Sequence, residues 1–166
     1  MEGVADSPAA TRLAALASIR ERVQGIKFTI LAGKYPAYSL TPSDRTLDTR
    51  GTRLVETVKL PSGMYKSRLE VEVSPLELAP QEGLREFAGS GEADLSEAGG
   101  RARARMVALE TAVGQAIINA VAQRYPPSSV PFQLTGTVYI LGTRREEIRR
   151  GSYLVEVRAR VALTAE

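Results

Sequence analysis

The chain combines stretches in which hydrophobic and polar residues alternate with stretches in which hydrophobic residues recur every three or four positions. Alternation places every second side chain on one face, as a half-buried strand requires. Leu69, Val71 and Val73, for example, alternate with charged residues. The pattern predicts strands at 26–31, 53–60, 65–73 and 85–93, and two more within 132–163. The charged loop at 142–152 joins the last two as an antiparallel hairpin.

The first stretch with helical spacing covers residues 7–24. Ser7 is a suitable N-cap, Pro8 suits the first helical position, and Gly25 can close the helix. A single apolar stripe is formed by Leu13, Leu16, Ile19 and Val23. We therefore predict a helix with one buried side.

A second, longer helix is predicted over 97–123, with Ser96 as its cap. Alanine falls at every fourth position of this helix, and larger apolar residues flank the alanines. The alanines are Ala104, Ala108, Ala112, Ala116 and Ala120. A line of small side chains lets a helix approach another surface closely, so we expect this helix to pack on the sheet.

Periodicity is lost between residues 33 and 53, where we expect an irregular loop. The order of elements predicts an α+β fold, with a mainly antiparallel sheet and both helices packed on one face. Residues 1–25 form an N-terminal helix or arm, and residues 26–166 form a single α+β domain.

Composition narrows the range of functions. The 166 residues include no cysteine, histidine or tryptophan, which removes thiol chemistry, disulfides, and histidine-based catalysis or metal binding. No stretch is apolar for the roughly 20 residues that span a bilayer. The net charge of +3 is small, and basic and acidic residues are interleaved, so we do not expect a nucleic-acid partner.

Glycines precede the long helix in an arrangement that can bind phosphate. However, the P-loop lysine is missing, and Asp94 stands where a dinucleotide-binding fingerprint needs glycine. Asp44 and Asp48 lack the spacing of a calcium loop. We expect no cofactor, no metal and no enzymatic activity, although a carboxylate or serine site invisible in the sequence would leave an enzyme as a third possibility.

One arginine cluster supports an alternative function. Arg144, Arg145, Arg149 and Arg150 lie in the charged loop, interrupted by Glu146 and Glu147. They would be the contacts of a small basic nucleic-acid-binding module. A solvated hairpin tip explains the same pattern. Arg101, Arg103 and Arg105 point to different sides of the long helix and form no single row.

The second half of the chain resembles a protein family. The strand ending in "GSGEADLS", the helix "ARARMVALETAVGQAIINAV" and the final strand "GSYLVEVRARVAL" look like the amino-terminal domain of flagellar assembly protein T and related small outer-membrane lipoproteins, including flagellar protein P. The resemblance covers about residues 86–165. Its turn and helix correspond to Gly91, Glu92, Ala93, Ala104, Ala108, Ala112 and Ala116.

This resemblance implies a non-enzymatic structural subunit of a ring- or disk-like homo-oligomer. Its partners would be flagellar or outer-membrane components, in the periplasm or at the outer membrane; without the resemblance we expect a cytoplasmic protein. The lipidation cysteine of such lipoproteins is absent, and residues 1–6 carry no export signal. We expect sheet edges and the 33–53 loop to contact neighbouring subunits, with Tyr35, Tyr38 and Leu40 as anchors.

Overall fold

A computed structural model describes residues 1–31, 37–47 and 49–164. Within these residues eight strands form two antiparallel sheets, so the predicted α+β class with a mainly antiparallel sheet is confirmed. The strands are β1 (Glu2–Ala5), β2 (Ile26–Leu31), β3 (Ala37–Pro42), β4 (Thr49–Lys59), β5 (Tyr65–Val73), β6 (Glu86–Asp94), β7 (Gln133–Arg149) and β8 (Ser152–Thr164). The helices are α1 (Pro8–Val23), α2 (Pro75–Leu78), η1 (Ala79–Gln81), α3 (Leu95–Ala98), α4 (Arg101–Arg124) and η2 (Pro127–Ser129).

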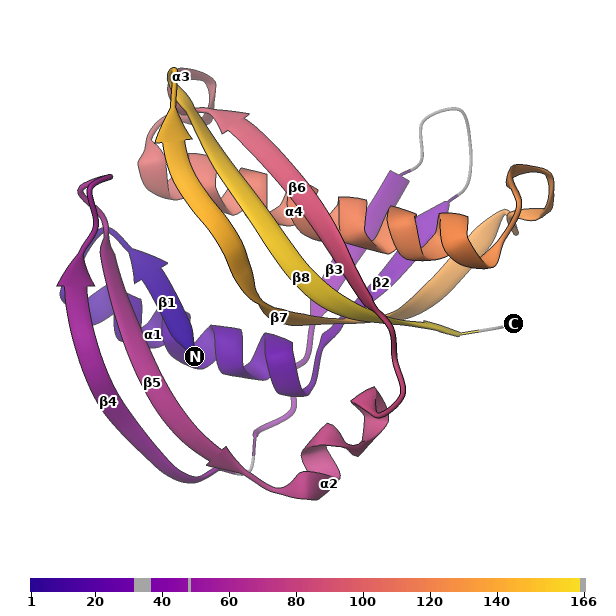
Figure 1. Cartoon of the computed structure of the whole chain (residues 1–166), viewed down its shortest axis with the longest axis horizontal. Coiled ribbons are helices and arrows are strands. Elements are labelled where there is room, and N and C mark those ends of the chain that lie inside the picture. Colours follow the sequence, from indigo (N-terminus) through magenta and orange to yellow (C-terminus); the bar gives the residue numbers. More distant parts are fainter. Residues whose placement is uncertain (32–36, 48, 165–166) are drawn as a thin grey trace.

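The larger sheet has the order β3-β2-β7-β8-β6 and is covered on one face by α4 (Figure 1). Its core consists of the alternating residues of β8 and β7 that face this helix. Tyr153, Val155 and Val157 are almost completely buried. The opposite face carries charged side chains, including Glu86, whose carboxylate lies 3.4 Å from the guanidinium of Arg160.

The smaller sheet, in the order β1-β5-β4, curves around α1 (Figure 1). A second hydrophobic cluster forms here from Ala15, Ile19, Val23 and Leu69. The side chains of Thr11 and Ser67, both completely buried, are hydrogen-bonded to each other across this contact. Gly3 allows β1 to lie directly on the helix, because a Cβ there would stand 2.0 Å from the backbone nitrogen of Ala15.

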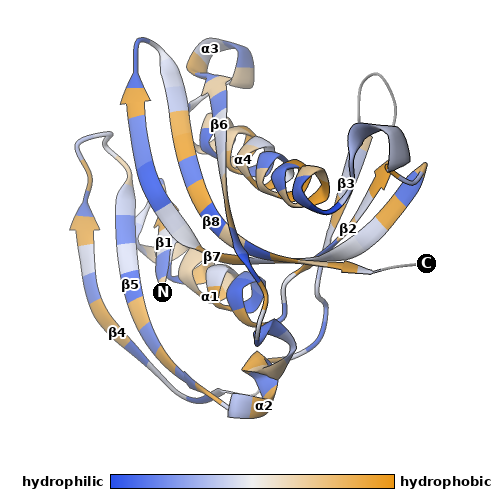
Figure 2. Ribbon diagram, turned by 45° about the vertical axis from the view of Figure 1, so that its right-hand side comes forward, coloured by the Kyte–Doolittle hydropathy of each residue, from blue (hydrophilic) through white to orange (hydrophobic). Residues whose placement is uncertain are grey.

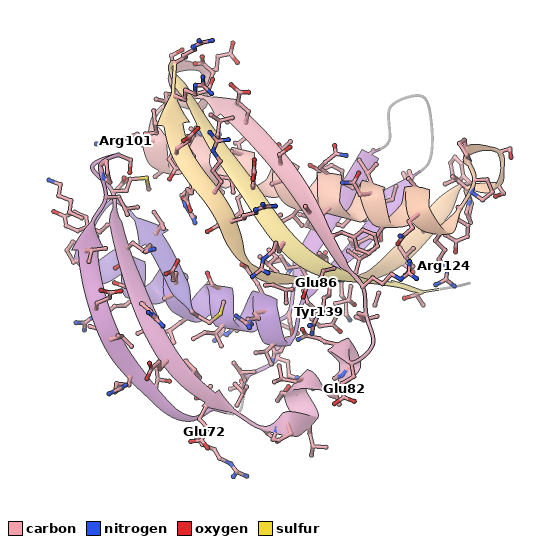
Figure 3. The ribbon with its side chains drawn as sticks, viewed as in Figure 1. Glu72, Glu82, Glu86, Arg101, Arg124 and Tyr139 are labelled. Atoms are coloured by element: carbon pink, nitrogen blue, oxygen red, sulfur yellow. The ribbon has the colours of Figure 1, made fainter. Side chains whose placement is uncertain are left out.

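Several contacts join the two sheets. Val4 and Met64, from the small sheet and its β4–β5 turn, belong to the main core cluster. The guanidinium of Arg101, at the start of α4, donates a hydrogen bond to the carbonyl oxygen of Ser62 in that turn (Figure 3). The amide of Gln81 donates to the carbonyl oxygen of Arg22, 2.6 Å away.

The alanine line of α4 lies against two glycines of β6. A Cβ at Gly91 would stand 1.9 Å from the carbonyl oxygen of Ala108, and one at Gly89 the same distance from that of Ala112. Strand and helix therefore touch backbone to backbone. The alanine spacing serves this contact within the chain, in agreement with the expected packing of the helix on a sheet.

Several finer expectations are corrected. The chain forms two sheets, with α1 on one and α4 on the other, so the helices do not share one face of a single sheet. Within residues 1–25, the predicted N-terminal helix is α1, and β1, which precedes it, pairs with β5. The segment 33–53 was expected to be irregular but contains β3 and the start of β4. The sequence pattern does not reveal β3 or the first residues of β4, because their side chains are mostly exposed and show no buried periodicity.

The charged segment 142–152 is mostly strand. β7 continues to Arg149, and the chain turns at Arg150 and Gly151, both of which have positive φ. The long helix begins later than expected, since Asp94 caps the short α3 and Gly99 ends it in a left-handed conformation. Gly91 and Ala93 lie within β6 and do not form a turn.

Candidate functional site

The three residues proposed as anchors between subunits differ in their surroundings. Tyr35 lies outside the described residues. Tyr38 is in β3, and its ring packs over Gly114 of α4, where its hydroxyl donates a 3.4 Å hydrogen bond to the carbonyl oxygen of Glu110. Burial raises the pKa of this tyrosine. Leu40 packs against the main core. Tyr38 and Leu40 thus have contacts within their own chain.

The four arginines of the nucleic-acid alternative do not form a uniform cationic surface. Arg145 lies 2.5 Å from Glu147 and 4.0 Å from Glu156. Arg144 and Arg149 belong to β7, and Arg150 is in the turn. Carboxylates of β7 and β8 therefore lie beside one of the four arginines, Arg145.

A buried polar cluster on the α4 side of the larger sheet was not predicted from the sequence. Arg105 of α4 forms an ion pair with Glu146 of β7, and their side chains are only 17% and 12% exposed. The hydroxyl of Tyr153 donates to the same carboxylate over 2.6 Å. Burial and this hydrogen bond raise the pKa of Tyr153. The sequence around Glu146 is charged on both sides and predicts a loop, so it carries no signal of this burial.

A cleft of about 440 Å³ opens beside this cluster, between β1, α1, α4 and β7. Glu21 and Arg105 both line the cleft. Burial raises the pKa of Glu21, and the charge of Arg105 partly opposes that shift. A pocket with shifted pKa values is the first sign of an enzyme. Here Arg105 is paired with Glu146.

The most unusual surface is the outer edge of β4. All 11 residues of the strand are exposed, and Figure 1 shows β5 on one side of β4 and no ribbon on the other. Leu54, Val55 and Val58 are 37%, 42% and 38% exposed. Figure 2 shows hydrophobic and hydrophilic residues mixed along this edge. An edge of this length presents unpaired backbone donors and acceptors to another strand.

Within the described ranges, no three acidic side chains are grouped to bind a metal ion. None of the helices in the same ranges has the length and hydropathy of a membrane span. No protein-family model matches the chain, and neither a curated protein nor a solved structure matches it significantly.

Proposed function

We propose that the chain is a non-enzymatic structural subunit that associates with copies of itself through a free sheet edge. The observation that carries this proposal is the exposure of β4 along its entire length. Strands usually have about 3–10 residues, and exposed edges are normally shortened, covered or protected by charge. The 11 exposed residues of β4 combine apolar side chains with charges of both signs, so a second copy can pair with them by strand addition.

The sequence supports the same proposal. The resemblance of residues 86–165 to the flagellar assembly family suggests a ring- or disk-like assembly at the flagellar motor or outer membrane. The lack of cysteine and histidine removes the commonest nucleophiles and bases. The nucleic-acid alternative has less support, because Glu147 of β7 and Glu156 of β8 lie beside Arg145.

The test is the mass of the protein in solution. Light scattering over a wide concentration range, followed by electron microscopy of any large species, should show assemblies heavier than the 17.9 kDa chain. Val55→Lys should weaken association, because a lysine at the edge is a common protection against strand pairing.

Leu76→Lys is the matched control. Leu76 is 84% exposed but lies in α2, away from β4, so this variant should assemble like the wild type. A monomer at every concentration would contradict the proposed function. Equal effects of the two lysines would point to a surface other than β4.

A further inference from the structure

We propose that β4 pairs antiparallel with β4 of a second copy across a two-fold axis, so that Arg53 of each copy lies opposite Glu56 of the other. This inference rests on the proposed function of self-association and specifies its contact. The pairing would join two three-stranded sheets into one sheet of six strands. Tyr38 and Leu40 then remain in their contacts within each chain.

The pairing of β4 with β5 defines the two faces of β4. Leu54 lies opposite Leu69, whose side chain is buried in the cluster with α1. Residues opposite one another in an antiparallel pair share a face. The face toward α1 therefore carries Thr52, Leu54 and Thr57, opposite Val71, Leu69 and Ser67. The outer face carries Gly51, Arg53, Glu56 and Val58, opposite Glu72, Glu70, Arg68 and Lys66.

A shift in this register occurs between Leu54 and Glu56. Val55 is the extra residue, and the alternation of faces is reset there. A two-fold pairing must also bring residues of the same face together along the whole strand. A two-fold axis through Val55 would place Arg53 of one copy opposite Thr57 of the other, which belongs to the other face. An axis through Leu54 would place Thr52 opposite Glu56, again from different faces.

A two-fold axis that passes between Leu54 and Val55 brings residues of the same face together. It pairs Arg53 with Glu56 and Gly51 with Val58 on the outer face, and Thr52 with Thr57 on the inner face. A pairing that involves only the residues on one side of Val55 would use half of the strand. A two-fold axis between Val55 and Glu56 also keeps the faces together, because it pairs Leu54 with Thr57 and Arg53 with Val58. Of these two registers, only the one centred between Leu54 and Val55 places Arg53 opposite a residue of opposite charge.

Charge complementarity supports the same register. Within one chain Arg53 lies 2.5 Å from the carboxylate of Glu70, and Glu56 is opposite Arg68. Across the proposed axis these residues form a row of alternating charge over four strands, in the order Glu70, Arg53, Glu56 and Arg68, where the last two belong to the second copy. The two-fold axis generates a second, equivalent row of the same four residues. Opposite charges on adjacent strands stabilise pairing, and like charges oppose it.

A charge exchange between two variants tests this register. Arg53→Glu alone would face Glu56 of its copy, and Glu56→Arg alone would face Arg53, so each variant should dimerise at least about tenfold more weakly than the wild type. In a mixture of the two variants, the glutamates at positions 53 and 56 of one face the arginines at positions 56 and 53 of the other. The mixture should therefore form a one-to-one heterodimer by light scattering. Association of the mixture also shows that both variants are folded.

Cysteine cross-linking provides a second readout, since the chain has no cysteine of its own. Gly51→Cys is tolerable because nothing lies within 4 Å of the new Cβ, and Val58 is exposed. A mixture of Gly51→Cys and Val58→Cys should form the mixed disulfide. Each variant alone should not, because identical positions would be roughly 20 Å apart.

The outcomes separate the two proposals. Assembly of the wild type without rescue in the charge-exchange mixture and without the mixed disulfide would overturn this register but leave the structural-subunit function standing. A wild type that stays monomeric at every concentration would overturn both. Rescue together with the mixed disulfide would establish the β4 pairing.

Discussion

At the scale of single residues, two glycines determine how closely α4 approaches the sheet. Gly89 and Gly91 leave no room for a side chain against the backbone of α4. The sequence showed the alanine line but not its counterpart, because glycine in a strand also marks turns and bulges. The strand predicted at 85–93 includes Gly91, whereas the family pattern puts a turn there, and the structure agrees with the strand.

We expect Gly91→Ala to lower the free energy of unfolding by about 1–3 kcal/mol, because the helix must move away from β6. Urea unfolding measures the change. Gly51→Ala is the control, since its Cβ meets nothing within 4 Å and its φ is not positive. The control should change stability by no more than about 0.5 kcal/mol. Equal losses in the two variants would contradict the close contact.

Glu21 makes stability depend on pH. Burial raises its pKa in the folded protein, so the folded chain holds this proton more tightly than the unfolded chain. The stabilising contribution is complete below the unfolded pKa of about 4.3 and is lost as pH rises through the raised folded value. Glu21→Gln should therefore raise Tm at neutral pH.

Near pH 4 the two proteins should melt alike, because both then carry an uncharged side chain at this position. Thermal melts of wild type and variant from pH 4 to 8 measure the difference. A Tm gain that is constant over this range would show that the charge of Glu21 is not the cause.

At the scale of elements, the limits of the first helix were predictable, but its buried side was predicted only in part, since Ile19 and Val23 are buried as expected. Ser7 accepts the hydrogen bond of an N-cap, as predicted. The buried positions are Thr11, Ala15, Ile19 and Val23, whereas Leu13 and Leu16 are exposed. Hydrophobicity alone favoured the leucines. The close approach of β1 instead requires small side chains, a condition that only the tertiary contact reveals.

This difference gives a direct test of the helix orientation. Ile19→Ala should cost about 2–4 kcal/mol, because it leaves a cavity in the second cluster. Leu13→Ser should cost less than about 0.5 kcal/mol, because Leu13 is 70% exposed. Chemical denaturation of both variants measures the two values. A larger loss for Leu13→Ser would mean that α1 is rotated from its position in the structure.

Strands were predicted well wherever one face is buried. The alternation in β5 and β8 gave their positions, whereas β3 and the first residues of β4 have too little burial to show a pattern. The cluster of Arg105, Glu146 and Tyr153 joins residues 41 and 7 positions apart in sequence. Such polar partners are brought together by the fold and have no local spacing that would reveal them.

At the scale of the whole molecule, the two hydrophobic clusters are not independent. Val4 and Met64 connect the small sheet to the main core, and Arg101 binds the β4–β5 turn.

We therefore expect a single unfolding transition. Far-UV circular dichroism and calorimetry should give the same midpoint, and Ile19→Ala should shift the whole transition. Two separate transitions, with only the lower one shifted by Ile19→Ala, would show that the small sheet with α1 unfolds on its own.

The symmetry of the proposed β4 contact limits how larger assemblies can be built. A two-fold contact occupies the same surface on both copies, so β4 can hold one neighbour only. A ring requires two neighbours for each chain, and the second must use another surface, such as the outer edges of β3 or β6. The two kinds of contact then alternate around the ring. A closed ring of this protein would therefore contain an even number of chains.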